Sequence, residues 1–199
     1  MESIDKNITN HIDKTPRGKI FFPEDFREYG SSGAIRVTLH RLVEKGEIKR
    51  IAQGVYVKPK VSKLLGKLTP TAEDVAIAIA KRDKARIIST GVHAQNRLGL
   101  STQVPTKAVY LTDGSPRLIK VGKRTILFKK TSPKNLSTKG EISTLVIQAL
   151  KDIGNGLLTE DEEKKVIAIL KKEDINNLKY DVKLAPVWIA EIMKKALNQ

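Results

Sequence analysis

The side chains best suited to do chemistry in this sequence lie in one short segment, GAIRVTLHRLVEKG (33–46). It combines arginines, a histidine and small residues at helical spacing. Arg36 and Arg41 could donate hydrogen bonds to guanine edges or to phosphate, and Val37 could meet a thymine methyl group. The two preceding serines, with the free N–H groups of a helix N-terminus, could hold a phosphate. The contact residues that the segment predicts are Ser31, Ser32, Arg36, Val37, His40 and Arg41.

Helical periodicity predicts that the other side of this segment faces the core. At about 100° per residue, Leu39 and Leu42 fall within about 40° of Ile35, with Val43 at the edge. The EIKRI and VYV segments that follow, joined by AQG, predict a β-hairpin. Its exposed polar side chains would reach the DNA backbone or the minor groove. They are Lys49, Arg50 and Gln53.

The first 60 residues predict an order of elements that could position this helix and hairpin. SIDKNITNHID (3–13) has apolar residues four positions apart, which is typical of a short helix. KIFF predicts an extended piece, and PEDFREYG begins with proline and ends with glycine, as a short helix does. The order helix, short strand, helix, helix, hairpin favours a winged helix-turn-helix domain over residues 1–60. Such domains bind DNA or serve as protein-interaction modules.

The remaining sequence predicts a second domain, so the whole chain is expected to be α+β. A lysine-, proline- and glycine-containing linker covers residues 61–70, and residues 71–199 follow as the second domain. After a helix in AEDVAIAIAKRD, the segments ARIIST, KAVYLT, PRLIKVG and RTILFKKT predict a small antiparallel sheet. Three terminal helices are expected, in GEISTLVIQALKDI, TEDEEKKVIAILKK and APVWIAEIMKKAL.

The charge of the chain favours a polyanionic or acidic partner, because 37 Lys and Arg stand against 22 Asp and Glu. Residues 61–135 hold 15 basic and 4 acidic side chains, so the excess lies in the middle of the chain. This basic surface could extend a DNA contact, bind an acidic protein patch, or simply be the solvated face of a sheet. RNA binding is a further alternative, although Tyr110 and Phe128 are few stacking rings for it. The additional basic surface comprises Lys120, Lys123, Arg124, Lys129 and Lys130.

Catalysis and metal binding find little support in the sequence. The histidines, His11, His40 and His93, are scattered, and no cysteine is present to form a disulfide or a thiolate metal site. Neither a G-x-x-x-x-G-K-[ST] loop nor a G-x-S-x-G elbow occurs, and the acidic run at 160–163 is typical of a helix start. We therefore expect no enzyme activity, no catalytic residue, no metal and no cofactor.

The block TGVHAQNRLGLSTQVP (90–105) holds polar side chains that could form a site, but its pattern favours an architectural role. No second histidine or carboxylate stands near His93 in the sequence, so a buried, hydrogen-bonded histidine is expected. Gln103, which precedes Val104 and Pro105, would bind backbone groups in a turn.

The expected location is the cytoplasm, without a membrane partner. No apolar run approaches the ~20 residues of a membrane span. The start of the chain, MESIDKNITNHIDK, lacks the basic and apolar regions of a signal peptide.

Two long segments resemble AbiEi-type antitoxins of type IV toxin–antitoxin systems. They are FFPEDFREYGSSGAIRVTLHRLVEKGEIKRIAQGVYVKPK and STGVHAQNRLGLSTQVPTKAVYLTDGSPRLIKVGKRTILFKKT, within about residues 15–155, and LGLSTQVP is the most specific part. The resemblance implies an N-terminal winged helix that represses its own operon. It also implies a C-terminal domain that neutralises a toxin similar to nucleotidyltransferases.

The expected partners are therefore double-stranded operator DNA and a cognate nucleotidyltransferase-like toxin. A single winged helix contacts one half-site, so binding is expected to involve two copies on an inverted repeat. The alternative is a one-component transcriptional regulator whose C-terminal domain senses a small molecule. A ligand that changes operator affinity would favour that alternative, whereas a neighbouring nucleotidyltransferase-like gene would favour the antitoxin.

Overall fold

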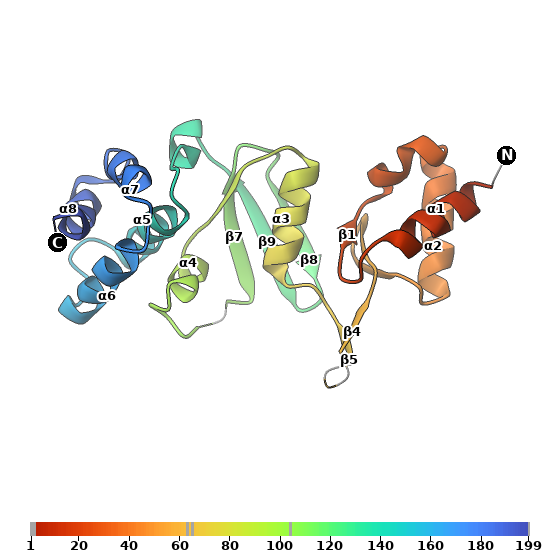
Figure 1. The fold of residues 1–199 in the computed structure, drawn as a ribbon, viewed down its shortest axis with the longest axis horizontal. Coiled ribbons are helices and arrows are strands. Elements are labelled where there is room, and N and C mark those ends of the chain that lie inside the picture. The colour runs from red at the N-terminus through yellow and green to blue at the C-terminus, as the bar shows by residue number, and fades with distance from the viewer. Residues whose placement is uncertain (1–2, 63, 65, 104, 199) are drawn as a thin grey trace. The chain divides into compact units, whose positions relative to one another are not determined.

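The protein has an α+β fold, seen in a computed structural model that describes residues 3–62, 64, 66–103 and 105–198 (Figure 1). The chain forms two compact units. Unit 1 comprises Met1–Ile79 and Ile119–Lys123, and unit 2 comprises Ala80–Leu118 and Arg124–Gln199.

The elements of the first 79 residues are α1 (Ile4–Lys14), β1 (Ile20–Phe21), the 3₁₀ helix η1 (Pro23–Tyr29), α2 (Ser32–Glu44), β2 (Lys49–Ala52), β3 (Val55–Val57), β4 (Lys60–Ser62), β5 (Gly66–Leu68) and the start of α3 (Ala72–Arg82). The later elements are β6 (Ile87–Ser89), α4 (Val92–Arg97), β7 (Lys107–Thr112), β8 (Arg117–Val121), β9 (Arg124–Lys130), η2 (Pro133–Leu136), α5 (Glu141–Ile153), α6 (Glu160–Leu170), α7 (Ile175–Val182) and α8 (Val187–Leu197). Every predicted helix and strand of the first 57 residues therefore has a counterpart in the structure.

A three-stranded antiparallel sheet of order β1-β3-β2 forms one side of unit 1. The short strand β1 pairs with β3 through Ile20↔Val57 and Phe21↔Tyr56, so the chain before η1 meets the hairpin that follows α2. Helices α1, η1 and α2 bury their apolar sides against one another, which removes their apolar surface from water. The buried cluster that they form with the sheet consists of Ile8, Ile12, Phe21, Phe26, Ile35, Leu39, Leu42, Ile48 and Tyr56.

Lys58, directly after β3, ties the sheet to the end of α1. Its ammonium donates to the carbonyl oxygens of Ile12 at 2.9 Å and Asp13 at 2.7 Å. The last carbonyl groups of a helix have no partner within the helix and carry its negative dipole end, so a cation is favourable there.

The segment predicted as a linker, residues 61–70, contains part of a two-stranded antiparallel hairpin, β4–β5, with Lys60 opposite Leu68. The composition of this segment predicts no strand, and the hairpin is therefore a difference from the sequence analysis. Gly66 adopts a φ of +67°, which a residue without Cβ tolerates best. Lys63 and Leu65 of the predicted linker lie outside the described residues, and unit 1 extends past the predicted boundary to Ile79.

The second sheet has the order β6-β7-β9-β8, and the prediction of an antiparallel sheet is wrong for its central pair. Strands β7 and β9 are parallel, with Tyr110 opposite Phe128. The chain passes from β7 to β8, which lies at the edge of the sheet, and the next strand, β9, lies between β7 and β8. Burial explains this order, because Ile126 and Phe128 of β9 are buried whereas β8 exposes Leu118. The more apolar strand takes the central position.

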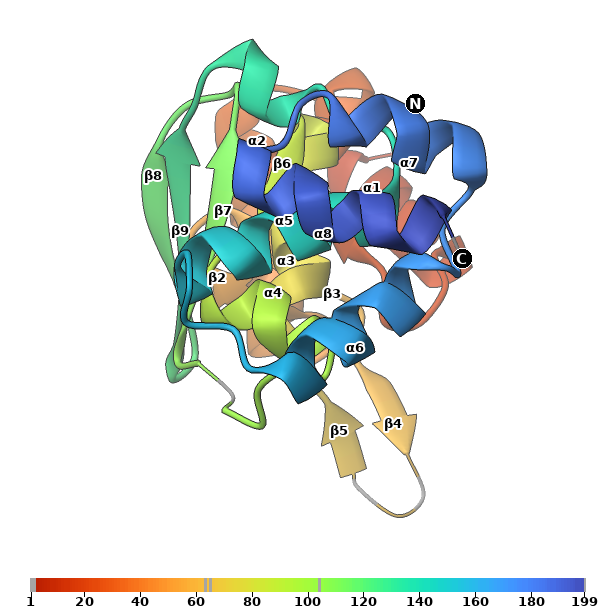
Figure 2. The ribbon, with the colours of Figure 1, turned by 90° about the vertical axis from the view of Figure 1, so that its left-hand side faces the viewer.

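Helices dominate the C-terminal half of unit 2, where α5, α6, α7 and α8 lie side by side (Figure 2). The predicted terminal helices correspond to α5, α6 and α8, but the sequence analysis missed α7. Helix α5 is central to their core: Val146, Ala149 and Leu150 have no exposed surface. Packing around one buried helix supplies most of the stability of such short helices.

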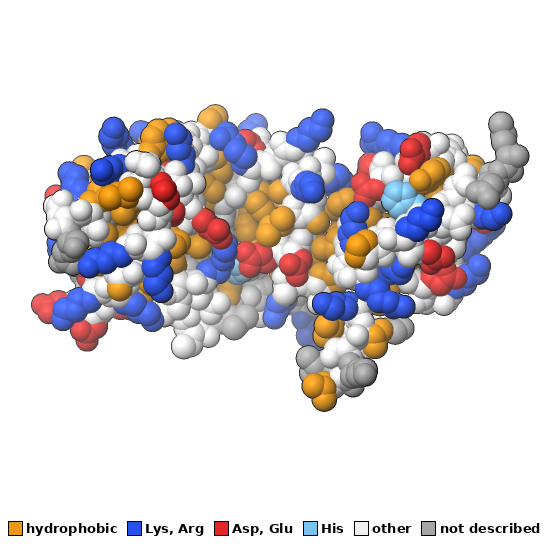
Figure 3. Space-filling view, in the orientation of Figure 1, with side chains coloured by type: hydrophobic (Ala, Val, Ile, Leu, Met, Phe, Trp, Pro, Cys, Tyr) orange, Lys and Arg blue, Asp and Glu red, His pale blue; other side chains and the backbone are white. Residues whose placement is uncertain are grey.

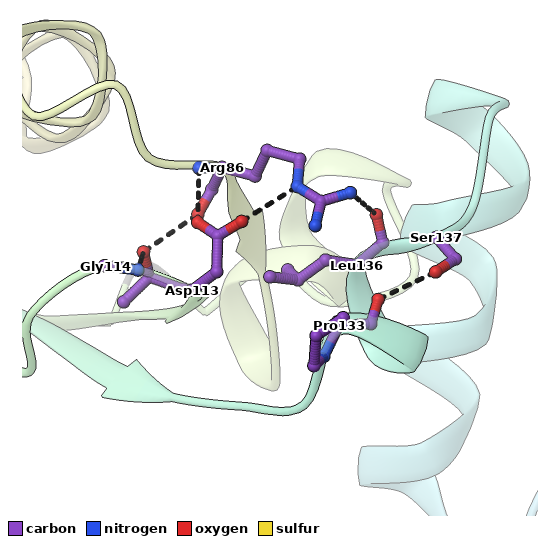
Figure 4. A network of polar contacts seen from close by, with 7 residues as sticks. Arg86, Asp113, Gly114, Pro133, Leu136 and Ser137 are labelled. Atoms are coloured by element: carbon purple, nitrogen blue, oxygen red, sulfur yellow. Dashed lines mark hydrogen bonds and ion pairs between the residues drawn. The ribbon is translucent and has the colours of Figure 1, made fainter.

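A polar network links three connections of unit 2 (Figure 4). The backbone N–H and the Nε of Arg86 donate to the two carboxylate oxygens of Asp113 at 2.8 and 2.9 Å. The Nη1 of Arg86 also donates to the carbonyl oxygen of Leu136. Hydrogen bonds from the side chain and then the backbone of Arg86 lower the pKa of Asp113. The chain before β6 is thereby joined to the end of β7 and to η2.

Candidate nucleic-acid interface

Helix α2 begins after a capping serine and is followed by a glycine. The hydroxyl oxygen of Ser31 accepts the N–H of Ala34 at 3.4 Å, which caps the first turn. Gly46, with φ +73°, follows the last turn. Ser31 and Ser32 are both exposed, so the start of α2 lies at the surface of unit 1. This is the arrangement needed for an incoming phosphate.

The two sides of α2 differ in burial as its periodicity predicts. Ile35, Leu39 and Leu42 are buried, and Val43 lies at the edge of the core. The other side faces solvent, and its valine, Val37, is 50% exposed. The exposed predicted contact residues of α2 are Ser31, Ser32, Arg36, Val37, His40 and Arg41.

Gly33 lies on the exposed side of α2, and packing does not require its small size. A Cβ built on Gly33 would meet no atom within 4 Å. We predict that Gly33→Ala stabilises the fold by about 0.5–1 kcal/mol, because alanine loses less backbone entropy in a helix. Urea unfolding of the two proteins measures this difference. A destabilised alanine variant would mean that the first turn of α2 is not the open, regular helix described here.

Arg41 is the only predicted contact residue of α2 that a carboxylate from another described element holds. Its Nη1 donates to Oδ2 of Asp5, on α1, at 2.9 Å. The other oxygen of Asp5 accepts the hydroxyl of Thr38, which is 3% exposed. The Thr38 hydrogen bond, and then Arg41, lower the pKa of Asp5. The Arg41 side chain keeps 60% of its surface exposed.

Arg36 and His40 differ from Arg41 in how they are held. His40 Nδ1 lies 3.8 Å from Oε1 of Glu44, one turn along α2, and both side chains are exposed. Within the described part of the chain, no hydrogen bond or ion pair is found for the Arg36 side chain. The exposed side of α2 thus presents two guanidinium groups, of which that of Arg41 is held by Asp5.

The β2–β3 hairpin presents the other predicted contact residues. Lys49 and Arg50 lie on β2 with exposed side chains, opposite Val57 and Tyr56 of the buried strand β3. An irregularity in the pairing follows Arg50. Gln53 is exposed in the turn beside Gly54, and the Nζ of Lys49 lies 3.5 Å from the hydroxyl of Thr69.

The additional basic surface is divided between the two units. Lys120 and Lys123 belong to the 119–123 segment of unit 1, whereas Arg124, Lys129 and Lys130 belong to unit 2. All five side chains are exposed. Arg124 and Lys130 are the two ends of β9, about 20 Å apart at the usual rise of a strand. On the face drawn in Figure 3, Lys and Arg side chains are scattered among acidic ones.

Sequence reasoning missed two residues of the candidate interface, Asp5 and Thr38. An acid in the first turn of a helix is typical of dipole compensation, so Asp5 gave no sign of a tertiary role. Thr38 carried a weak signal: its helical angle lies on the Ile35 side of α2, where a buried hydroxyl needs a partner.

The His93 block makes contacts within its own unit. His93 Nδ1 lies 2.5 Å from the hydroxyl of Ser89, and its ring centroid is 5.7 Å from that of Tyr110. The Asn96 amide donates to the carbonyl oxygens of Ser101 and Gln103. Val104 of this block lies outside the described residues. In the described ranges, no three His, Asp or Glu side chains are grouped to hold a metal ion.

Among the described helices, none combines the length and the apolar character of a bilayer-spanning segment. Two comparisons bear on the chain as a whole. The model of a protein family described as "Family of unknown function (DUF6088)" matches residues 7–178. No curated protein matches the chain.

Proposed function

Because the chain belongs to the DUF6088 family, whose function is unknown, we propose a function from the geometry of unit 1: residues 1–60 are a winged helix-turn-helix domain that binds duplex DNA. In this proposal α2 enters the major groove, and the β2–β3 hairpin is the wing. Two supports are the order α1, β1, η1, α2, β2, β3 and the pairing of β1 with β3.

The observation that carries the proposal is the exposed side of α2. An exposed helix side normally presents mixed charges to water. This side presents two arginines, a histidine, a valine and a glycine beside a single acid, Glu44, while Ile35, Leu39 and Leu42 on the other side are buried. Arg36 and Arg41 have the donor geometry for guanine O6 and N7, and Val37 the apolar surface for a thymine methyl group. A helix about 10–12 Å across fits the major groove, which is about 12 Å wide.

The wing and the start of α2 would supply contacts that position the protein without reading sequence. Lys49, Arg50 and Gln53 could donate to phosphates or reach the minor groove. Ser31 and Ser32 flank free N–H groups at the positive end of the helix dipole, where a phosphate binds favourably.

The resemblance to AbiEi-type antitoxins supports an extension of this proposal. The protein would repress its own operon through unit 1 and neutralise a nucleotidyltransferase-like toxin through residues 71–199. The division of the chain into two compact units is compatible with two separate tasks. Two copies would bind an inverted repeat, since one α2 covers only a half-site.

Selection from a library of random duplexes tests the DNA-binding proposal. We expect enrichment of a sequence with two inverted half-sites whose centres are about 10–10.5 base pairs apart, or a multiple of that spacing. Failure to enrich any sequence, with binding no tighter to duplex DNA than to a polyanion such as heparin, would overturn the proposal.

The wing predicts a defined salt dependence. We expect affinity for the selected duplex to fall steeply between 50 and 200 mM salt, because each phosphate contact contributes about −0.9 to the log–log slope. The double variant Lys49→Ala, Arg50→Ala should reduce the magnitude of this slope by about 2. Fluorescence anisotropy titrations measure it. The matched control, Lys171→Ala with Lys172→Ala in unit 2, also removes two exposed charges and should keep the wild-type slope.

Coexpression of the protein with the product of a neighbouring gene distinguishes the antitoxin proposal from the alternative of a small-molecule-sensing regulator. Growth rescue of cells that express a toxic neighbouring gene product would support the antitoxin. Rescue should persist in a variant whose α2 arginines are replaced, since neutralisation is assigned to the other unit. A small molecule that changes affinity for the selected duplex, without any rescue, would support the one-component regulator instead.

A further inference from the structure

We infer that Asp5 is a positioning residue for DNA recognition: it orients the Arg41 guanidinium toward one base edge and so determines sequence specificity more than affinity. This inference rests on the proposed function of α2. It concerns a residue of α1 that faces the recognition helix and has no expected contact with DNA of its own.

The position of the Asp5 carboxylate is fixed through both of its oxygens. One oxygen accepts the hydroxyl of Thr38 and the other accepts Nη1 of Arg41 at 2.9 Å. Thr38 is 3% exposed, so its hydroxyl is confined to the interior side of α2. Thr38 and Arg41 are three residues apart and therefore adjacent on the helix surface. A buried group thus anchors the carboxylate, and the carboxylate anchors an exposed guanidinium.

The contact with Asp5 leaves the recognition edge of Arg41 available. A guanidinium has five N–H donors, and Asp5 takes one of them, on Nη1. The Nε–Nη2 edge provides the two parallel donors that match guanine O6 and N7. The Arg41 side chain is 60% exposed, so this edge is open to an incoming base. Part of its rotamer freedom is already lost before binding, which lowers the entropic cost of the complex.

The charge of Asp5 acts against nonspecific DNA. Its pKa is lowered by Thr38 and Arg41, so the carboxylate is ionised at neutral pH. A negative charge beside the groove repels phosphates on every sequence, whereas the orientation of Arg41 helps only where a guanine is present. Asp5 should therefore weaken nonspecific binding and strengthen discrimination.

The test compares affinities for the selected duplex and for a scrambled duplex of the same composition. We expect Asp5→Ala to lower the ratio of specific to nonspecific affinity by about tenfold, the size of one base contact, while affinity for the scrambled duplex rises. In an Arg41→Ala background, Asp5→Ala should change the ratio less than about twofold, since no guanidinium remains to be oriented. Asp5→Asn, which keeps the size of the side chain, replaces Asp5→Ala if the alanine variant does not fold.

Asp13→Ala is the matched control, because Asp13 is an exposed aspartate on the same helix. It adds the same net charge and should raise both affinities together, with an unchanged ratio. If Asp5→Ala behaves in the same way as Asp13→Ala, or if it lowers the ratio equally without Arg41, the positioning role is wrong. A wild-type protein that selects no duplex would instead refute the proposed function itself.

Discussion

Replacing Arg36 and Arg41 together by alanine is expected to weaken binding to the selected duplex at least about 30-fold. A bidentate arginine–guanine pair contributes about 1–3 kcal/mol of discrimination, and 1.4 kcal/mol corresponds to a tenfold change in affinity. The two arginines lie about 7.5 Å apart along the axis of α2, at 1.5 Å per residue. That separation covers about two base-pair steps, so both can contact one half-site.

The fold should tolerate these substitutions, which makes the result interpretable. Both side chains are exposed, and Asp5 keeps its hydrogen bond from Thr38 when Arg41 is removed. The exposed Asp5–Arg41 pair itself contributes little to stability. Circular dichroism and urea unfolding check that the double variant is folded.

Arg36→Lys with Arg41→Lys is the matched control for charge. Lysine keeps the positive charge but lacks the planar fork that binds two acceptors. This variant should retain affinity for scrambled DNA and lose discrimination for the selected duplex. If the double alanine variant binds the selected duplex as well as the wild type does, α2 is not the recognition helix.

Local periodicity was sufficient to predict the two sides of α2. Ile35, Leu39 and Leu42 recur at the helical repeat and are buried as predicted. The capping serine and the glycine after α2 are local signals of the same kind, because both depend on neighbouring backbone groups alone. Whether the exposed side contacts DNA stays a prediction.

Contacts between distant segments could not be predicted in this way. Asp5 and Arg41 are 36 positions apart, and only the packing of α1 against α2 brings them together. The same limit applies to the second sheet. Alternating residues indicated the strands β7, β8 and β9, but their order depends on which strand buries the most apolar surface. The parallel β7–β9 pair is the result.

Helix α7 of unit 2 also depends on contacts between distant segments, which the sequence alone does not show. Its sequence, INNLKYDV, contains two asparagines, an aspartate and a valine, which have low helix propensity, so local propensity gives little support for a helix. Asp181 holds it in place instead. The carboxylate oxygens of Asp181 accept the N–H groups of Lys139 and Gly140, each at 2.8 Å, and the hydroxyl of Ser143.

Asp181 and Glu173 together satisfy the start of α5. Glu173 Oε2 accepts the N–H groups of Ile142 and Ser143 at 2.8 and 3.1 Å. The first N–H groups of a helix have no partner within it and carry its positive dipole end, so carboxylates stabilise them. Because α5 is the central helix of unit 2, these two acids hold the connection on which the later helices pack.

We expect Asp181→Ala to destabilise unit 2 by about 3–5 kcal/mol, the usual cost of removing one member of a buried charged hydrogen-bond network. Asp181 has no exposed surface, so its loss leaves the buried N–H of Gly140 without its acceptor and removes one partner each from the Lys139 N–H and the Ser143 hydroxyl. Urea unfolding followed by the fluorescence of Trp188, in α8, reports on this unit. Asp161→Ala, on the exposed first turn of α6, should change stability by less than about 0.5 kcal/mol.

The same variant separates the two tasks proposed for the chain. The buried cluster of unit 1 is composed of residues between Ile8 and Tyr56, and none of them is a member of the Asp181 network. Asp181→Ala should therefore abolish growth rescue in the coexpression experiment while affinity for the selected duplex changes less than about twofold. A loss of stability below about 1 kcal/mol would contradict the role of Asp181. Equal losses of rescue and of DNA binding would contradict the assignment of the two functions to separate units.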